Sequence, residues 1–346
     1  MKALLLSQYR QLDVTDIPVP AFSDNEILVR VAACGICGSD VHGFDGSSGR
    51  RIPPIVMGHE AAGIISEVGK NVSGFKRGDR ITFDSTVYCG DCPNCRRGDI
   101  NLCDRRQVLG VSCGDYRRNG AFAEFVVVPS RIAYHLPENL SFNEAALLEA
   151  VSVALHAVAL APKRAGSTAL VVGAGTIGLL VQQSLAACGY SRIFVTDVDQ
   201  NRLKLSEKLG ATAVLRSGPE LLPEILRLTS GVGADVVIEA VGNNLAVTCA
   251  INCTRKGGTV VLVGNISPEV TIPLQVVVSR QIRLQGSCAS CGEYPRAIEL
   301  MGGGKINVKP LISAVAPLDE GPQWFERLHA REPNLMKVVL APGEIA

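Results

Sequence analysis

The first third of the chain contains short apolar runs separated by turn-forming residues. The runs are residues 2–6, 26–33, 61–68 and 79–84, and Gly, Pro and Asp lie between them. Short runs with these boundaries are typical of strands, and helices do not alternate with them here. We therefore predict a small, mostly antiparallel, barrel-like domain over residues 1–150.

A helical pattern begins near residue 141. Ser141 and Glu144 have the spacing of a capping box, in which two side chains satisfy free N–H groups at a helix start. A long apolar run with helical character continues to about Leu160. We interpret this run as the boundary between two domains.

From Thr168 onward, apolar strands alternate with amphipathic helices. Strands are expected within residues 169–175, 192–197, 213–215, 235–242, 259–264 and 282–287. Nearly continuous apolar strands at this spacing indicate a parallel sheet covered on both faces, the doubly wound α/β (Rossmann) arrangement. The alternation ends after about Ser290. We expect a nucleotide-binding domain at 151–289 and a return segment at 290–346 that completes the first domain.

The composition excludes several kinds of partner. Of the 346 residues, 47% are apolar and 19% are charged, which is enough apolar material for a compact fold. The net charge of +1 is spread without long runs of one sign, which argues against nucleic acid and membrane surfaces as partners. An export signal and a run of about 18 apolar residues are both missing, so we expect a cytoplasmic protein.

The twelve cysteines are grouped in short clusters, which favours metal binding over disulfides in a long chain of this kind. Cys89, Cys92, Cys95 and Cys103 place four soft ligands within fifteen residues. Four thiolates close a tetrahedral site without an open position, so we predict a structural zinc. Free thiols or loop disulfides are the alternative.

A glycine-rich turn directly follows the apolar strand predicted at residues 169–172. Gly173, Gly175 and Gly178, with Thr176 and Ile177 between the last two, form the pattern GxGxxG at a helix start. Glycines there let the backbone approach a pyrophosphate, and the free N–H groups of the helix bind it. The sequence therefore predicts a dinucleotide site.

An acidic residue at the end of the next strand supports this interpretation. Asp197 lies about 20 residues on, where a carboxylate binds the adenine ribose and repels a 2′-phosphate, so NAD is favoured over NADP. Arg202 could reach the ribose side, and Val241 and Val263 follow later strands as further expected cofactor contacts. The alternative is an ordinary strand–helix turn with Asp197 as a surface acid.

A second set of candidate metal ligands is dispersed along the chain. It consists of Cys37, His59, Glu60 and Glu149. Taken singly, each residue has an ordinary explanation: a small core cysteine, a satisfied polar histidine, or a solvated acid. Spacing alone does not join them.

The chain resembles the zinc-containing medium-chain alcohol dehydrogenases over almost its whole length. The residues that carry the resemblance are 35–40, 58–63, 78–80, the four-cysteine segment, 120–124 and 173–178. The resemblance implies a GroES-like catalytic domain beside the Rossmann domain. Glu149, where alcohol dehydrogenases have a second cysteine, and Glu60 beside His59 are similar to the polyol (sorbitol, L-iditol), butanediol and threonine dehydrogenase branch.

This resemblance implies a catalytic zinc held by Cys37, His59 and a carboxylate. We favour Glu60 as the direct ligand, with Glu149 in exchange with it or acting through water. Zinc would polarise the hydroxyl of a small polar alcohol, and NAD would accept its hydride.

The resemblance also assigns residues around the metal. Ser39 and His42 match positions of a proton relay, for which imidazole has a suitable pKa. The alternative for this pair is a turn-forming serine and a surface histidine. Asp40 is expected to orient His59 as an acceptor for its second ring N–H.

We expect the residues that select the substrate to lie around residues 44–51, around Tyr116 and at 287–293. Sorbitol dehydrogenases commonly have an Arg and an aromatic residue in the last region, whereas this chain has Ser290 and Cys291. The prediction is therefore a secondary alcohol or polyol, with a vicinal diol, a sugar phosphate and L-threonine as alternatives.

Relatives usually form dimers or tetramers, and the apolar segment 260–278 is a candidate interface for a homo-oligomer. A zinc-free quinone or enoyl reductase, or a nucleotide-binding protein without catalysis, is the alternative of a different class. Those proteins would have disrupted ligands at Cys37, His59 or Glu60, and all three are present.

Overall fold

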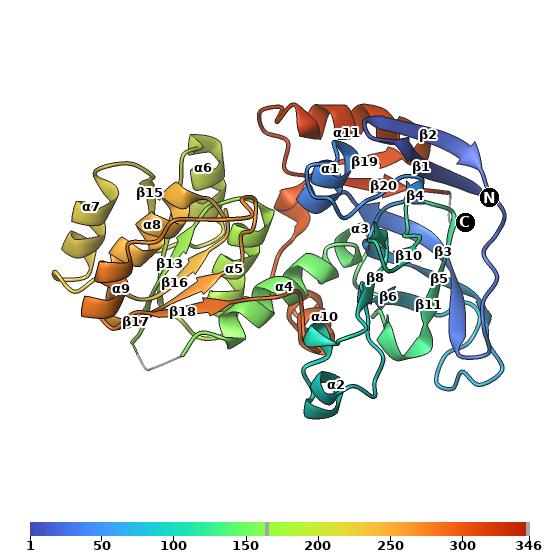
Figure 1. The fold of residues 1–346 in the computed structure, drawn as a ribbon, viewed down its shortest axis with the longest axis horizontal. Helices are drawn as coiled ribbons and strands as arrows, with labels where there is room; N and C mark the ends of the chain where they lie inside the picture. Colours follow the sequence, from blue (N-terminus) through green and yellow to red (C-terminus); the bar gives the residue numbers. More distant parts are fainter. Residues whose placement is uncertain (163–165, 344–346) are drawn as a thin grey trace. The chain divides into compact units, whose positions relative to one another are not determined.

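The computed structural model describes residues 1–162 and 166–343, which separate into two units (Figure 1). Unit 1 contains Met1–Glu149, Tyr294–Gly302 and Val308–Ala346, and unit 2 contains Ala150–Glu293 and Gly303–Asn307. The expected return segment therefore joins unit 1 at Tyr294, and the short piece 303–307 within it belongs to unit 2. The last three residues of the return segment, 344–346, lie outside the described part of the chain.

Unit 1 is built on a seven-stranded sheet with the order β12-β6-β5-β3-β20-β19, in which β11 also pairs with β3. Its strands are β3 (Glu26–Gly35), β5 (Glu60–Val68), β6 (Arg80–Phe83), β11 (Phe125–Pro129), β12 (Ala133–His135), β19 (Ile312–Pro317) and β20 (Lys337–Ala341). Neighbouring strands are antiparallel except β19 and β20. This architecture confirms the predicted, mostly antiparallel β domain.

Smaller elements complete unit 1. A three-stranded sheet and two short pairs are formed by β1 (Lys2–Gln8), β2 (Gln11–Asp16), β4 (Ile55–Val56), β7 (Thr86–Val87), β8 (Gln107–Val108), β9 (Val111–Ser112) and β10 (Arg117–Arg118). The helices are α1 (Gly38–Phe44), α2 (Pro93–Arg97), α3 (Phe142–Ala145), α10 (Tyr294–Gly302) and α11 (Gly321–His329). Short 3₁₀ turns cover Ile100–Leu102, Ser130–Ile132, Lys309–Leu311 and Leu318–Glu320.

The core of unit 1 brings together segments from both ends of the chain. Leu4, Ile27 and Phe122 are fully buried in one apolar cluster with Phe325 of α11. The rings of Phe44 and Phe122 each lie 5.7 Å from that of Phe325. This packing fixes α1, which the sequence pattern does not predict, against the C-terminal part of the chain.

The predicted boundary helix consists of two helices. Ser141 caps α3 through the expected capping box with Glu144, but α3 ends at Ala145. The apolar run then forms α4 (Leu148–Ala159), which ends one residue before the expected Leu160. Glu149 therefore lies in the first turn of a separate helix.

Unit 2 is a six-stranded parallel sheet with the order β15-β14-β13-β16-β17-β18. Its strands are β13 (Thr168–Val172), β14 (Arg192–Asp197), β15 (Ala213–Arg216), β16 (Ala234–Glu239), β17 (Thr254–Leu262) and β18 (Arg283–Gly286). The helices besides α4 are α5 (Thr176–Ala187), α6 (Gln200–Lys208), α7 (Leu221–Leu228), α8 (Asn244–Cys253) and α9 (Leu274–Ser279). The strand order reverses beside β13, as in a doubly wound Rossmann sheet, and this confirms the predicted fold class.

None of the described helices is both long enough and apolar enough to cross a membrane.

Candidate metal centres and dinucleotide site

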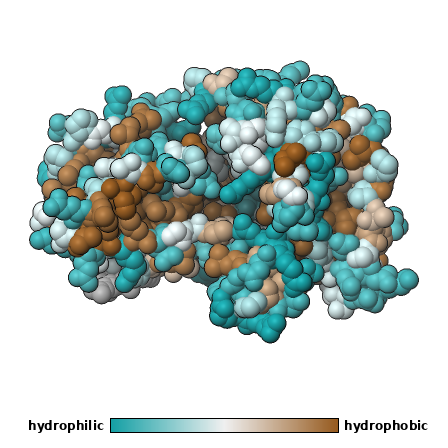
Figure 2. All heavy atoms as spheres, viewed as in Figure 1, coloured by the Kyte–Doolittle hydropathy of each residue, from teal (hydrophilic) through white to brown (hydrophobic). Residues whose placement is uncertain are grey.

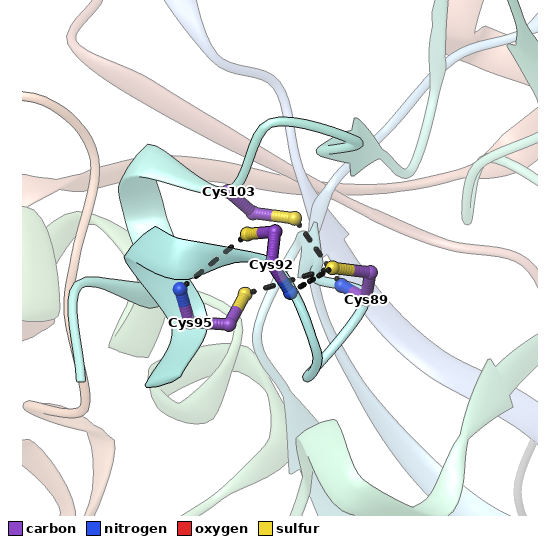
Figure 3. A group of neighbouring side chains, drawn as sticks. All are labelled: Cys89, Cys92, Cys95 and Cys103. Atoms are coloured by element: carbon purple, nitrogen blue, oxygen red, sulfur yellow. Dashed lines mark hydrogen bonds between the residues drawn. The ribbon is translucent and has the colours of Figure 1, made fainter. Parts of the chain in front are cut away.

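The four-cysteine segment folds into a loop between β7 and β8. The four sulfur atoms lie within 4.8 Å of one another, and Figure 3 shows them pointing toward a common centre. Local sequence explains the turn, because Cys92 is the N-cap of α2 and Pro93 occupies its first position. The loop thus brings four thiols close enough together to hold one metal ion.

Backbone N–H groups stabilise negative charge on these sulfurs by donating hydrogen bonds to them. The N–H of Cys92 donates to the sulfur of Cys89, and the N–H of Cys95 donates to the sulfur of Cys92, both at 3.4 Å. The N–H of Cys89 donates to the sulfur of Cys103 at 3.2 Å. The Cys95 N–H and further hydrogen bonds lower the pKa of Cys92 to about 7. Burial and the neighbouring sulfurs raise the pKa of Cys95 to about 12. Four sulfurs this close ionise together only with a cation to balance them, so the segment fits zinc.

A second cluster joins Cys37, His59 and Glu60, whose ligand atoms lie within 4.8 Å of one another. The sheet register explains the meeting, because β3 and β5 pair Gly35 with Glu60 at one end. Cys37 follows β3 as the N-cap of α1, and His59 directly precedes β5. Residues from separate segments therefore meet at one end of these two neighbouring strands.

Glycines leave the space that this cluster needs. A Cβ atom on Gly35 would lie 2.5 Å from Oε2 of Glu60. Gly58, directly before His59, has a φ of +95°, and a Cβ there would lie 2.9 Å from the sulfur of Cys34. Any side chain at Gly35 would displace the Glu60 carboxylate, and any side chain at Gly58 would strain the backbone that carries His59.

Asp40 contacts the cluster from behind His59. Its Oδ1 lies 3.3 Å from Nδ1 of His59, although the angle does not meet hydrogen-bond geometry. Its Oδ2 accepts the N–H of Cys37 at 3.2 Å. Burial would raise the pKa of Asp40, but His59, Arg51 and the Cys37 N–H lower it to about 2. Asp40 is thus a buried anion, and it leaves Nε2 of His59 for a metal.

A buried lysine, which the sequence analysis does not single out, faces Glu60. Nζ of Lys337 on β20 lies 2.6 Å from Oε2 of Glu60 and donates to the carbonyl of Ile36 at 3.1 Å. Both side chains are at least 97% buried. Burial opposes the charge, but Glu60 and Cys37 raise the pKa of Lys337. The only sequence signal is a charged residue at the start of an otherwise apolar strand.

Glu149 is outside the group of three ligands that the structure brings within 4.8 Å of one another. It is half-buried, and desolvation together with Glu60 and Asp84 raises its pKa to about 7. The fully buried ring of Tyr294 stacks on Tyr134 in the same unit, with ring centroids 5.0 Å apart. Of the two candidate carboxylates, Glu60 is thus the one that the structure brings together with Cys37 and His59.

Ser39 and His42 lie on α1, one helical turn apart. Oγ of Ser39 accepts a hydrogen bond from Nη2 of Arg51 at 3.1 Å. Nδ1 of His42 lies 3.3 Å from Oγ of Ser47. The structure therefore puts both expected relay residues on the helix that starts at Cys37.

The glycine-rich turn of unit 2 has the geometry that the pattern predicts. Gly173 has a φ of +97°, and Gly175 is the N-cap of α5. A Cβ on Gly178 would lie 1.8 Å from the carbonyl oxygen of Gly173, and one on Gly173 would lie 2.6 Å from the side chain of Val241. Thr176 and Ile177 form the first residues of α5. Only glycines allow this close passage of backbone at the helix start.

Asp197 ends β14 and contacts the same turn. Its Oδ2 accepts the N–H of Ala174 at 2.6 Å, and its Oδ1 accepts the N–H of Asp199 at 2.8 Å. Nη1 of Arg202 lies 4.0 Å from Oδ2 of Asp197. Val263 follows β17, and its N–H donates to the carbonyl of Glu239 at 2.9 Å. These residues therefore share the carboxyl edge of the parallel sheet, where such sheets bind ligands.

The regions expected to select the substrate have different environments. Phe44 is buried against α11, and Arg51 is buried beside Asp40. Tyr116 is half-buried, and burial and Cys113 raise its pKa. In the segment 287–293, Glu293 pairs with Nδ1 of His156 at 2.8 Å, a contact that the sequence analysis does not include.

Two family models match this chain. Residues 23–138 match the alcohol dehydrogenase GroES-like domain, and residues 176–302 match the zinc-binding dehydrogenase model. Sorbitol dehydrogenase of Bacillus subtilis is 34% identical over 99% of this chain and 98% of its own length.

Two solved structures share the fold and carry a cofactor. A putative zinc-binding dehydrogenase of Sinorhizobium meliloti, bound to NADP, has a TM-score of 0.88 and 32% identity over 99% of each chain. An alcohol dehydrogenase of Escherichia coli, complexed with NADH, has a TM-score of 0.90 and 27% identity over 99% of each chain. The chain thus belongs to the zinc-binding alcohol dehydrogenase family, and the predicted family, fold and enzyme class are confirmed.

Proposed function

We propose that this enzyme oxidises a secondary hydroxyl group of a small polyol to a ketone, with a zinc ion at Cys37, His59 and Glu60 and with NAD as hydride acceptor. The meeting of these three ligand atoms within 4.8 Å is the observation that carries the proposal. The likeness to a sorbitol dehydrogenase along nearly the whole chain supports the polyol class.

The donor set fits a catalytic zinc. One thiolate, one imidazole and one carboxylate are three protein ligands, which leave the fourth position of a tetrahedral ion for substrate. His59 and Glu60 are 6% and 1% exposed, so the site excludes most water. Asp40 and Lys337 contact the imidazole and the carboxylate from outside, and such partners orient metal ligands.

The cofactors supply the reactive groups. When bound, zinc polarises the substrate hydroxyl as a Lewis acid, and the nicotinamide accepts the hydride. The chain's own residues manage the proton: Ser39 receives it from the substrate hydroxyl, and His42 delivers it to solvent at near-neutral pH. Asp40 holds the His59 ring so that the Nε2 lone pair faces the cluster.

In this proposal the four-cysteine loop binds a second, structural zinc ion, so that each chain holds two zinc ions. Its four sulfurs leave no ligand position for a substrate. Because both sites need reduced thiols, a reducing compartment such as the cytoplasm suits the protein.

The choice of NAD over NADP rests on Asp197. Its carboxylate lies at the carboxyl edge of the sheet and is 6% exposed, where it repels a 2′-phosphate. Arg202 is a competing positive charge, with Nη1 4.0 Å from the same carboxylate. One of the two solved relatives binds NADP and the other binds NADH. The cofactor preference proposed for this chain therefore depends on its own residues.

Unit 2 has an exposed apolar surface that supports a homo-oligomer. Leu274 and Val278 of α9 are 63% and 70% exposed, and β18 is one of the two edge strands of the sheet. Figure 2 shows apolar side chains gathered over this part of unit 2. We propose a dimer or tetramer in which this edge and helix are covered by another copy.

A substrate panel tests the proposed reaction. The zinc-loaded protein is incubated with NAD and with sorbitol, xylitol, 2,3-butanediol, L-threonine, galactitol 1-phosphate or ethanol, and NADH is followed by absorbance. We expect the highest kcat/KM on an uncharged polyol. Activity confined to ethanol, threonine or the sugar phosphate would overturn the polyol class, and a lack of activity on the whole panel would overturn the reaction.

A further inference from the structure

Arg51 is a buried arginine beside the proposed catalytic zinc site. It is 4% exposed, and its Nη2 donates to Oδ1 of Asp40 at 3.2 Å and to Oγ of Ser39 at 3.1 Å. One guanidinium nitrogen therefore touches both the carboxylate behind His59 and the hydroxyl proposed for proton transfer. A buried guanidinium needs such partners, because an unpaired charge is poorly solvated in the protein interior.

We propose that Arg51 is a positioning residue for both halves of the site: it holds the Asp40 carboxylate in place beside His59 and fixes the direction of the Ser39 hydroxyl. This inference rests on the zinc and relay roles proposed above.

The contacts of Asp40 show why it needs a third anchor. Oδ2 is fixed by the Cys37 N–H, while Oδ1 faces both Nδ1 of His59 and Nη2 of Arg51. The contact with His59 lacks hydrogen-bond geometry, so it does not by itself fix the carboxylate. The Arg51 contact does meet hydrogen-bond geometry, and it sets the position from which Oδ1 acts on the imidazole.

The Ser39 hydroxyl gains a defined direction from the same contact. A serine hydroxyl has two lone pairs and one proton. Arg51 has no acceptor, so it always occupies one lone pair of Ser39 and never takes the proton. One lone pair and one proton remain, which is the combination that a relay group needs to accept a proton on one side and donate one on the other.

The local sequence makes room for Arg51. Gly43 of α1 passes directly over its side chain, and a Cβ atom on Gly43 would lie 2.2 Å from Cγ and 2.9 Å from Cβ of Arg51. Those atoms are near the root of the side chain, so the arginine could not bend away without moving its guanidinium. Gly43→Ala is therefore an independent way to displace Arg51 without removing its charge.

The experiment compares Arg51→Gln, Arg51→Lys and Gly43→Ala with Arg80→Gln as a matched control. Arg80 also donates to two acceptors in unit 1, the carbonyls of Pro137 and Leu140, at 3.0 and 2.5 Å. The first readout is the zinc affinity of the Cys37 site, measured by chelator competition while the four-cysteine site stays loaded. The second is the absorption spectrum of the protein with cobalt(II) at the Cys37 site. The third is kcat with its solvent deuterium isotope effect.

We expect Arg51→Gln to weaken zinc binding about 10- to 100-fold, the usual range for a residue that orients a metal ligand. The cobalt spectrum should change, and kcat should fall with little change in KM. Arg51→Lys, which keeps the charge, should restore part of the affinity, and Gly43→Ala should resemble Arg51→Gln. Arg80→Gln should stay within twofold of the wild type in zinc affinity.

A double-variant cycle separates positioning from general damage. Arg51→Gln should lower kcat much less in a Ser39→Ala background than in the wild type, because part of its effect passes through Ser39. Equal effects in both backgrounds, or an Arg51→Gln protein with wild-type zinc affinity and cobalt spectrum, would overturn the inference. If Arg51→Gln does not fold, Arg51→Lys and Gly43→Ala decide by the same readouts. An inactive wild type would refute the proposed reaction, whereas zinc affinity and the cobalt spectrum would still test Arg51.

Discussion

Replacing Lys337 by Met tests the buried ion pair with Glu60. The change leaves the Glu60 carboxylate buried with no ammonium 2.6 Å away. Loss of one partner from a buried pair typically costs about 3–5 kcal/mol, because the other charge stays in a medium that solvates it poorly. For a unit of 150–250 residues, a loss of about 3 kcal/mol lowers the melting temperature by about 6–12 °C.

The assay is thermal unfolding of the metal-free protein, followed by circular dichroism. Lys337→Arg keeps the charge and should melt closer to the wild type. Lys337→Met combined with Glu60→Gln removes both charges and should recover much of the lost stability. Zinc should reduce the loss in the single variant, because the ion would balance Glu60 in place of the ammonium. A Lys337→Met protein that melts within about 1 °C of the wild type would refute this reasoning.

Three further predictions concern the other charged and thiol groups. The folded pKa of Asp40, about 2 against an ordinary 3.8, means that it stabilises the fold by about 2 kcal/mol above pH 4 and loses this contribution as the pH falls toward 2. In urea unfolding of the metal-free protein, the stability difference between wild type and Asp40→Asn should therefore shrink between pH 5 and pH 3; a constant difference would contradict the shift. Cys95→Ser should lower both the zinc content and the melting temperature while kcat of the remaining folded protein changes little; unchanged metal and melting would refute the structural site. Asp197→Ala should raise kcat/KM with NADP relative to NAD by at least about tenfold, which corresponds to 1.4 kcal/mol; an unchanged ratio would remove Asp197 from cofactor choice.

Features encoded within a short stretch of chain could be predicted from the sequence. The turn from Gly173 to Gly178 and the four cysteines between Cys89 and Cys103 each lie within one loop, so spacing and residue type specify their geometry. The parallel sheet was predicted for a similar reason, since each strand carries its own apolar run.

Contacts between distant segments could not be predicted in this way. Lys337 and Glu60 are 277 positions apart, and they meet only because β20 and β5 both pair with β3. Arg51 follows a glycine-rich turn and has no periodic signal that marks it as buried. The meeting of Cys37 and His59 depends on the register of β3 and β5, and the resemblance to a family, rather than spacing, suggested it.

The zinc content of the purified protein and of Cys37→Ser tests the central claim most directly. The account predicts two zinc ions per chain in the wild type and one in the variant, because the four-cysteine loop keeps its own ion. Equal zinc content in the two proteins would contradict a metal centre built on Cys37, His59 and Glu60.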